Sequence, residues 1–234
     1  MKNKPEWRAK LALACYIALI GGILIGSIIV ELILFGIGID PLDLPFSFAL
    51  ISMPVNESII LAVTLLFARH KNAGLNELGL KKASLEILAI VSVLAMLLFL
   101  LVTGISIVEE IIFGPDPLGE FVAKLVMPKD SLQLITLIAF SLFLVGPCEE
   151  LAFRGFVQKG FENSLGKMKG LLIASVLFGL LHGLNTLYAI VPLIVVGLIF
   201  GYVWQKTGGN TTASALMHGA YNSIAIAIAY FLTV

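Results

Sequence analysis

Six polar residues with the chemistry of a hydrolase lie in the apolar second half of this 234-residue chain. They are two adjacent carboxylates, a guanidinium, two imidazoles and an amide: Glu149, Glu150, Arg154, His182, His218 and Asn222. A carboxylate with an imidazole can activate a water molecule, and an imidazole with an amide can donate hydrogen bonds to a developing oxyanion. Because hydrocarbon penalises ionisable groups, those kept inside apolar segments are candidates for a functional site.

The first motif joins the two glutamates to an arginine. Glu150 and Arg154 are four residues apart, so they share a helix face and can form an ion pair. Two adjacent carboxylates cannot both ionise cheaply at low dielectric, so we expect Arg154 to keep one charged and leave the other as a general base. Pro147 is expected to kink the helix just before them. An ion-pair cluster at a helix end explains this motif equally well.

The second and third motifs place imidazoles and an amide at a similar depth. At 1.5 Å per residue, His182 lies about 18 Å from Gly170, where its helix is expected to enter the membrane. His218 and Asn222 share a helix face and lie about 10 and 17 Å from Thr211. Helix packing explains a single histidine equally well. The convergence of three helices at one level favours catalysis.

The composition indicates a membrane protein. The chain is 59% hydrophobic and 13% charged, with a mean hydropathy of +1.03. Soluble domains average about 45–50% apolar and about 25% charged residues. We therefore predict one integral-membrane domain over residues 1–234, an all-α polytopic bundle of transmembrane helices. The zero net charge argues against a nucleic-acid partner, and Cys15 and Cys148 form neither a disulfide framework nor a CxxC metal motif.

Seven apolar segments meet or approach the roughly 20 residues that a spanning helix needs. They are 11–38, 46–68, 85–107, 132 to about 158, 170 to about 183, 187–205 and 211–232. The first follows a basic start but is too long for a signal peptide, so we predict that it is retained. The fifth is short, which is acceptable for a helix that its neighbours cover.

The basic residues predict the orientation of the bundle. With the N-terminus inside, all but Lys124 and Lys129 of the 15 lysines and arginines fall in cytoplasmic segments, as the positive-inside rule requires. We predict a cytoplasmic N-terminus, a plasma-membrane location and a site that faces the cytoplasm. The outer segment 108–130 is expected to hold a short interfacial helix at about 118–127. Glycine pairs at four-residue spacing are candidates for close helix contacts: Gly22/Gly26, Gly179/Gly183 and Gly197/Gly201.

Taken together, the three motifs resemble those of a known family. Glu149-Glu150-x-x-x-Arg154, Phe178-x-x-x-His182 and His218-x-x-x-Asn222 follow one another on successive late helices. This order is similar to that of the CPBP family of intramembrane proteases, also called Abi or type II CAAX prenyl endopeptidases. The motif region covers 132–232, and the stretch 78–82 also resembles a family feature. The first three spans match only in character.

The resemblance implies an endopeptidase that acts on a membrane-associated protein or peptide, such as a CAAX-type prenylated protein. In the family, the first glutamate and the first histidine are thought to activate water, which on this chain are Glu149 and His182. The second histidine and the asparagine are thought to bind the oxyanion, and these are His218 and Asn222. The implied partners are a lipidated or membrane-proximal substrate and the bilayer.

The resemblance also implies supporting roles and raises the question of a metal. Glu150 and Arg154 would support and orient the catalytic groups. The family has been described both as metalloproteases and as metal-free glutamate peptidases. We expect no obligatory metal, since no HExxH helix occurs and an asparagine suits an oxyanion better than zinc. The alternative is a zinc ion held by Glu149, His182 and His218.

Other interpretations stay open at this point. A proton-coupled transporter would use the glutamates and histidines as a relay, although no inverted repeat is evident. A non-catalytic scaffold or immunity protein is a third class. Cys148 with a histidine and Asn222 would fit a thiol protease. Glu31, Asn56 and Glu57 lie inside predicted spans and are functional candidates without an assigned role.

Overall fold

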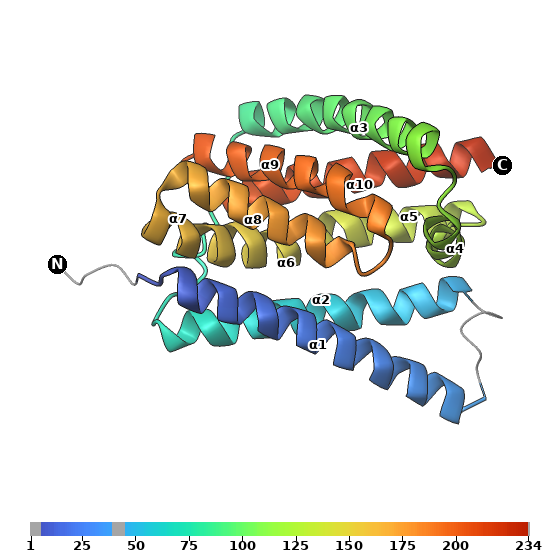
Figure 1. The fold of residues 1–234 in the computed structure, drawn as a ribbon, viewed down its shortest axis with the longest axis horizontal. Helices are drawn as coiled ribbons and strands as arrows, with labels where there is room; N and C mark the ends of the chain where they lie inside the picture. The colour runs from blue at the N-terminus through green and yellow to red at the C-terminus, as the bar shows by residue number, and fades with distance from the viewer. Residues whose placement is uncertain (1–5, 39–44, 234) are drawn as a thin grey trace.

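The computed structural model describes residues 6–38 and 45–233, and within these ranges it contains helices and connecting turns but no strand. The elements, in chain order, are α1 (Ala9–Gly36), α2 (Pro45–His70), α3 (Leu85–Phe113), α4 (Pro117–Val126), α5 (Ser131–Phe140), the π-helix η1 (Ser141–Val145), α6 (Gly146–Glu150), the π-helix η2 (Leu151–Gln158), α7 (Lys159–Leu165), α8 (Lys167–His182), the 3-10 turn η3 (Leu187–Ala189), α9 (Ile190–Lys206) and α10 (Thr211–Thr233). In Figure 1, α1 begins at one end of the bundle and α10 ends at the other.

Six helical segments of the described chain are long and apolar enough to cross a bilayer. They are Ala9–Gly36, Ala49–His70, Leu85–Phe113, Ser131–Leu165, Leu187–Lys206 and Thr211–Leu232. The predicted all-α polytopic membrane bundle is therefore confirmed. The other predicted span lies in α8, whose 16 residues fall short of the roughly 20 required. Because α8 packs along α9 (Figure 1), neighbours cover it. A seventh crossing and a cytoplasmic N-terminus stay predictions.

The short helix predicted at 118–127 is present as α4, and its position at the membrane interface stays a prediction. The Asp116 side chain caps its N-terminus by accepting a hydrogen bond of 3.0 Å from the Gly119 N–H. The Thr186 hydroxyl donates to the same carboxylate at 2.6 Å. Since Thr186 follows α8 closely, this contact fixes the end of the helix that carries His182.

The segment Ser131–Leu165 is one long rod with two π-helical stretches, one on each side of α6. The Gly146 N–H donates to the Ser141 carbonyl five residues back, so the turn widens just before Pro147. A proline has no N–H to give to the preceding turn, and the wider turn accommodates it without ending the helix. π-Helical turns are frequent at functional sites, and here they flank the two glutamates.

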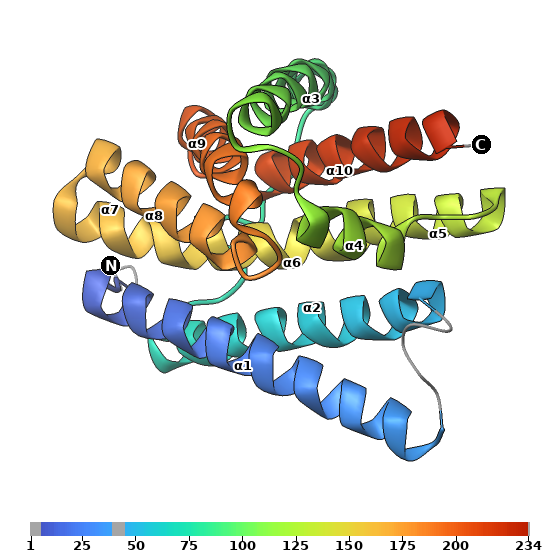
Figure 2. The same ribbon diagram turned by 45° about the vertical axis from the view of Figure 1, so that its right-hand side comes forward.

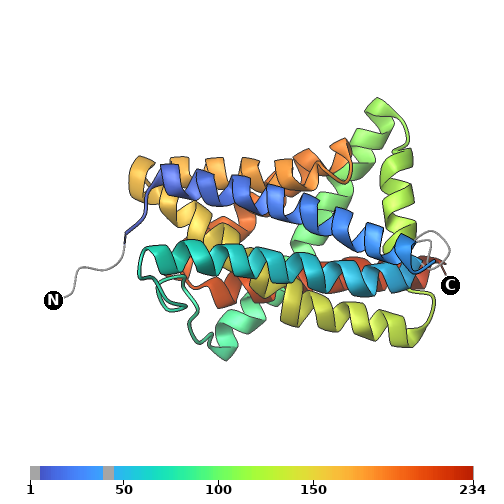
Figure 3. The same ribbon diagram turned by 90° about the horizontal axis from the view of Figure 1, so that it is seen from below.

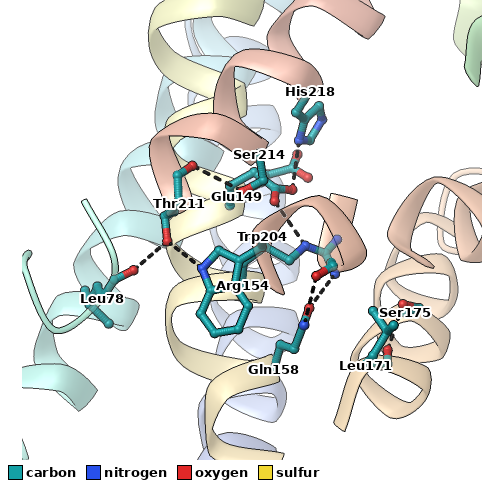
Figure 4. A network of polar contacts seen from close by, with 12 residues as sticks. Leu78, Glu149, Arg154, Gln158, Leu171, Ser175, Trp204, Thr211, Ser214 and His218 are labelled. Carbon is teal, nitrogen blue, oxygen red and sulfur yellow. Dashed lines mark hydrogen bonds and ion pairs between the residues drawn. The ribbon is translucent and has the colours of Figure 1, made fainter. Parts of the chain in front are cut away.

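The stretch 78–82 holds the start of α10 in place. The Thr211 N–H donates to the Gly79 carbonyl at 2.8 Å, and its hydroxyl donates to the Leu78 carbonyl at 2.6 Å. Trp204 donates to the same hydroxyl at 3.1 Å, so Thr211 lies between Leu78 and Trp204 (Figure 4). A side-chain carbon at Gly155 of η2 would lie 2.5 Å from the Leu78 carbonyl. This loop therefore positions α10 and η2, which carry half of the predicted site residues.

The glycine pairs all lie at close helix contacts, as predicted. Gly22 and Gly26 on α1 face Ile59 of α2, where an added side-chain carbon would overlap its methyl groups. Gly179 lies on α8 and Gly183 directly after its end, while Gly197 and Gly201 lie on α9, and these glycines let the two helices approach each other. Without side chains at these positions, backbones can pack at short range and make extensive dispersion contacts.

Candidate active site

The candidate site lies around α6, where helices from distant parts of the chain meet. Figure 2 shows α6 between α2 on one side and α10 on the other, and both helices pack against it. In Figure 3, α1 and α2 run side by side across the outer face of the bundle. The site is therefore enclosed by early and late helices together.

Glu150, Arg154 and His218 form a buried ionic network. The Arg154 Nε donates to Glu150 Oε2 at 3.0 Å, and both side chains are 0% exposed. This is the predicted ion pair. His218 Nδ1 lies 3.3 Å from the other carboxylate oxygen, Glu150 Oε1. Arg154 also donates to Gln158 at 3.4 Å (Figure 4). Since a carboxylate accepts, the His218 Nδ1 carries a hydrogen in this contact, and its Nε2 is turned away from Glu150.

Glu149 and His182 form a second pair, and it is the more accessible of the two. His182 Nε2 lies 3.8 Å from Glu149 Oε2, with side chains 21% and 11% exposed. Glu149 Oε2 has no hydrogen-bond partner among the described residues. His182 Nδ1 donates to the Phe178 carbonyl at 2.9 Å, because a carbonyl only accepts. That contact leaves Nε2 directed at Glu149, too far for a direct hydrogen bond but within reach of a shared water.

Phe178 connects the two pairs. Its ring centroid lies 4.5 Å from that of His182 and 6.1 Å from that of His218. The Arg154 guanidinium carbon lies 5.2 Å above the same ring. Phe178 is 1% exposed, so its ring is held in place by packing and contacts both imidazoles and the Arg154 guanidinium. The motif spacing in the sequence indicated the position of Phe178 but not this central role.

Two further residues were not foreseen from the sequence. Phe200 of α9 is fully buried, with its ring 4.9 Å from His218. Its neighbours in the sequence are apolar, and nothing marked it. Gln158 is also fully buried, and it donates to Glu162 at 2.8 Å and to the Gly201 carbonyl at 3.3 Å. The four-residue spacing from Glu150 through Arg154 to Gln158 and Glu162 was a signal that could have identified this ladder.

Asn222 and Cys148 differ in what surrounds them. Asn222, one turn beyond His218 on α10, is half-buried and makes no hydrogen bond within the described part of the chain. Its amide is therefore available to a ligand. Cys148 is buried, and no hydrogen bond or ion pair joins it to a histidine in residues 6–38 and 45–233. This arrangement gives no support to a thiol protease.

The three unassigned polar residues lie in different environments. Glu31 is exposed near the end of α1. Asn56 accepts a hydrogen bond of 3.4 Å from Ser27, so it joins α1 to α2. Glu57 is 6% exposed and lies on α2, which packs against α6 and η2. Of the three, only Glu57 adds a group to the site.

The donor set does not form a metal site in this arrangement. Within the described ranges, no group of three or more histidine, cysteine, aspartate or glutamate side chains is placed to hold a metal ion. His218 directs Nδ1 at Glu150, while Glu149 pairs with His182. The predicted zinc ligands thus belong to two separate pairs.

The fold and the site define the class of the protein as a polytopic helical membrane protein with a buried site of carboxylates and imidazoles. Residues 131–224 match the family model described as type II CAAX prenyl endopeptidase Rce1-like. The match runs from the start of α5 into the second half of α10 and contains all six predicted site residues. The predicted resemblance to the CPBP family is therefore confirmed over this segment.

One relative is a Mycoplasma capricolum subsp. capricolum protein described only as uncharacterized. It is 26% identical over 98 residues, which are 42% of this chain and 28% of that protein. The aligned region is thus little more than a quarter of that relative. No solved structure matches the chain.

Proposed function

We propose that this protein is an intramembrane endopeptidase that cleaves a membrane-associated protein or peptide with a water activated by Glu149 and His182. The observation that carries the proposal is this pair. Glu149 Oε2 and His182 Nε2 lie 3.8 Å apart and their side chains keep partial exposure, whereas the second pair is closed off. The family match of residues 131–224 supports peptide-bond hydrolysis as the reaction.

In the proposed reaction, Glu149 accepts a proton from the water as its oxygen attacks the carbonyl carbon of the scissile bond. In this proposal His182 carries a hydrogen on Nε2 as well and donates it to the oxygen of the same water, while its Nδ1 donates to the Phe178 carbonyl. Breakdown of the tetrahedral intermediate breaks the C–N bond, and Glu149 returns the proton to the leaving nitrogen. The products are a carboxylate and an amine.

His218 and Asn222 are proposed to donate to the oxyanion. Glu150 fixes the His218 ring through Nδ1, so the opposite nitrogen, Nε2, points away from the ion pair. A hydrogen on Nε2 and the Asn222 amide would then provide two donors from one face of α10. Arg154 is the counterion of Glu150 and stabilises its ionised form. The ionised carboxylate in turn orients the His218 ring.

The proposed substrate is lipidated or lies close to the membrane, with CAAX-type prenylated proteins as the leading class. A site among apolar helices is accessible to a chain that is already held in the bilayer. The asymmetry of the basic residues supports entry from the cytoplasmic side. Six apolar helices in the described ranges support a multi-pass membrane location, and we propose that the membrane is the plasma membrane.

The test uses purified protein in detergent and a fluorogenic farnesylated CAAX peptide. Wild type is expected to cleave it, and Glu149→Ala is expected to lose activity because Glu149 is the carboxylate that pairs with His182. Cys148→Ser is the matched control one residue away, and we expect near-wild-type turnover. Cleavage that survives Glu149→Ala would overturn the mechanism.

A chelator arm separates the two types of peptidase. Activity that persists after exhaustive chelation is expected for a glutamate peptidase. Activity that is lost on chelation and restored by zinc would replace the proposed reaction with a metal-dependent one. The same peptide without its lipid tests the substrate class, and we expect it to be cleaved less efficiently.

A further inference from the structure

Glu57 is a buried carboxylate that the proposed reaction does not use. It lies in the middle of α2 and is 6% exposed, so more than nine-tenths of it is buried. Its Oε2 has no hydrogen-bond partner among the described residues. An unpaired polar atom in a packed interior destabilises a protein, so its presence there requires an explanation.

The packing of α2 directs Glu57 at the site. The buried residues Glu57, Ile60, Thr64 and Ala68 recur at intervals of three and four and mark the inward face of the helix. This face packs against α6 and η2. Glu57 is therefore on the side of α2 that faces the two glutamates and not the lipid.

Glu57 and Glu149 share one small region. They are close enough for their charges to repel each other, and Cys148 lies within range of both. Glu149 Oε2 is also a buried atom without a partner among the described residues. The packed helices α2 and α6 thus carry one unpaired carboxylate acceptor each, and His182 Nε2 lies 3.8 Å from the acceptor on α6. Within the described ranges, no lysine or arginine pairs with either carboxylate, and the basic group next to Glu149 is His182 at 3.8 Å.

We propose that Glu57 is a positioning residue that accepts the second hydrogen of the water activated by Glu149. A water molecule has two O–H donors, and two unpaired carboxylate acceptors on opposite helices match them. With both hydrogens held by carboxylates and one lone pair accepting from His182, the remaining lone pair of the oxygen is left to attack the carbonyl carbon. This inference rests on the proposed hydrolytic function and names a further residue for it.

A purely structural role predicts a different result. If Glu57 stabilised the fold, its replacement by an apolar residue of similar size would destabilise the protein. If it is kept for function, the same replacement removes an unpaired polar group and leaves stability unchanged or higher. Under the proposed role, the apolar replacement of Glu57 therefore lowers turnover without lowering stability.

The experiment compares Glu57→Leu, Glu57→Gln and the matched control Asn56→Leu in detergent-purified protein. Asn56 is the preceding residue, but it faces α1 through Ser27. For Glu57→Leu we expect kcat to fall by about 100-fold with KM unchanged, as for a mispositioned reactant. Glu57→Gln keeps an acceptor oxygen and should recover most of that loss. Asn56→Leu should retain wild-type kcat, and the melting temperature of Glu57→Leu should equal or exceed that of wild type.

Each other outcome overturns the inference and identifies the cause. If Glu57→Leu keeps wild-type kcat while Glu149→Ala is inactive, hydrolysis stands and the role of Glu57 fails. If Glu57→Leu melts well below wild type and Glu57→Gln does not restore turnover, Glu57 is structural. If wild type cleaves no peptide, the proposed function fails and the inference fails with it.

Discussion

Removal of the Arg154 side chain should destabilise the protein strongly, because it leaves Glu150 charged and without its counterion. The pair is 0% exposed on both sides, with an N–O distance of 3.0 Å. For unit charges about 4 Å apart at an effective dielectric constant near 20, the attraction is about 4 kcal/mol. Measured costs of breaking a buried pair by removing one partner are about 3–5 kcal/mol. We therefore expect Arg154→Met to lose about 3–5 kcal/mol of unfolding free energy.

The remaining contacts place the expected value within that range. Glu150 would keep the contact with His218 at 3.3 Å, which compensates part of the loss. Gln158 and Phe178 would lose the guanidinium at the same time. The double variant Glu150→Leu/Arg154→Met removes the buried carboxylate that Arg154→Met alone leaves without its counterion. Most of the stability should then return, because replacing a whole buried pair by apolar residues is often neutral.

The assay is a denaturant titration in mixed micelles, followed by circular dichroism and by tryptophan fluorescence. Arg69→Met is the control, since Arg69 is exposed at the end of α2, and it should change stability by less than about 0.5 kcal/mol. A loss below about 1 kcal/mol for Arg154→Met would refute the account, because exposed ion pairs give values of that size. A double variant no more stable than the single one would refute it as well.

Two further changes test the oxyanion donor and the loop that holds α10. Asn222→Ala should lower kcat by about 10²–10³ with little change in KM, since an oxyanion donor acts mainly in the transition state. Ser223→Ala is the control, because its hydroxyl bonds within its own helix and its loss should leave kcat unchanged. A raised KM at constant kcat for Asn222→Ala would contradict the role of Asn222 as an oxyanion donor. Gly79→Ala should destabilise the protein and reduce turnover, because Gly79 has a φ of +87° and a side-chain carbon there would lie 2.5 Å from the Gly209 carbonyl. Gly114→Ala shares the positive φ but has open space around it, so equal losses in thermal unfolding would show that the loop contact is unimportant.

The helices could be predicted from the sequence because the bilayer constrains each segment separately. In hydrocarbon a spanning chain must satisfy its backbone hydrogen bonds internally, so apolar length alone indicates a helix. The segment predicted at 211–232 corresponds to α10 within one residue, whereas α3 begins at the predicted residue 85 but runs on to Phe113, beyond the predicted end at 107. The segment at 170–183 shows the limit of this reasoning, because neighbours cover α8 and its length no longer decides whether it crosses.

The composition of the site could also be predicted in part, because motif spacing is a local property. The pairing of Glu150 with Arg154 follows from four residues on one helix face. The contact between Glu150 and His218 joins residues 68 apart and depends on the rotation of two helices about their axes. The sequence predicted that these groups would gather but not which carboxylate would face which imidazole.

Only the tertiary structure decided the surroundings of the site. Phe200 and Gln158 became recognisable as parts of it once α9 and η2 were placed beside α10. Glu57 was one of three intramembrane polar residues without a role, and the rotational setting of α2 separated it from the others. The apolar pattern of a chain determines which segments become helices. Side-chain packing determines how each helix is turned, and packing involves partners that are distant in the sequence.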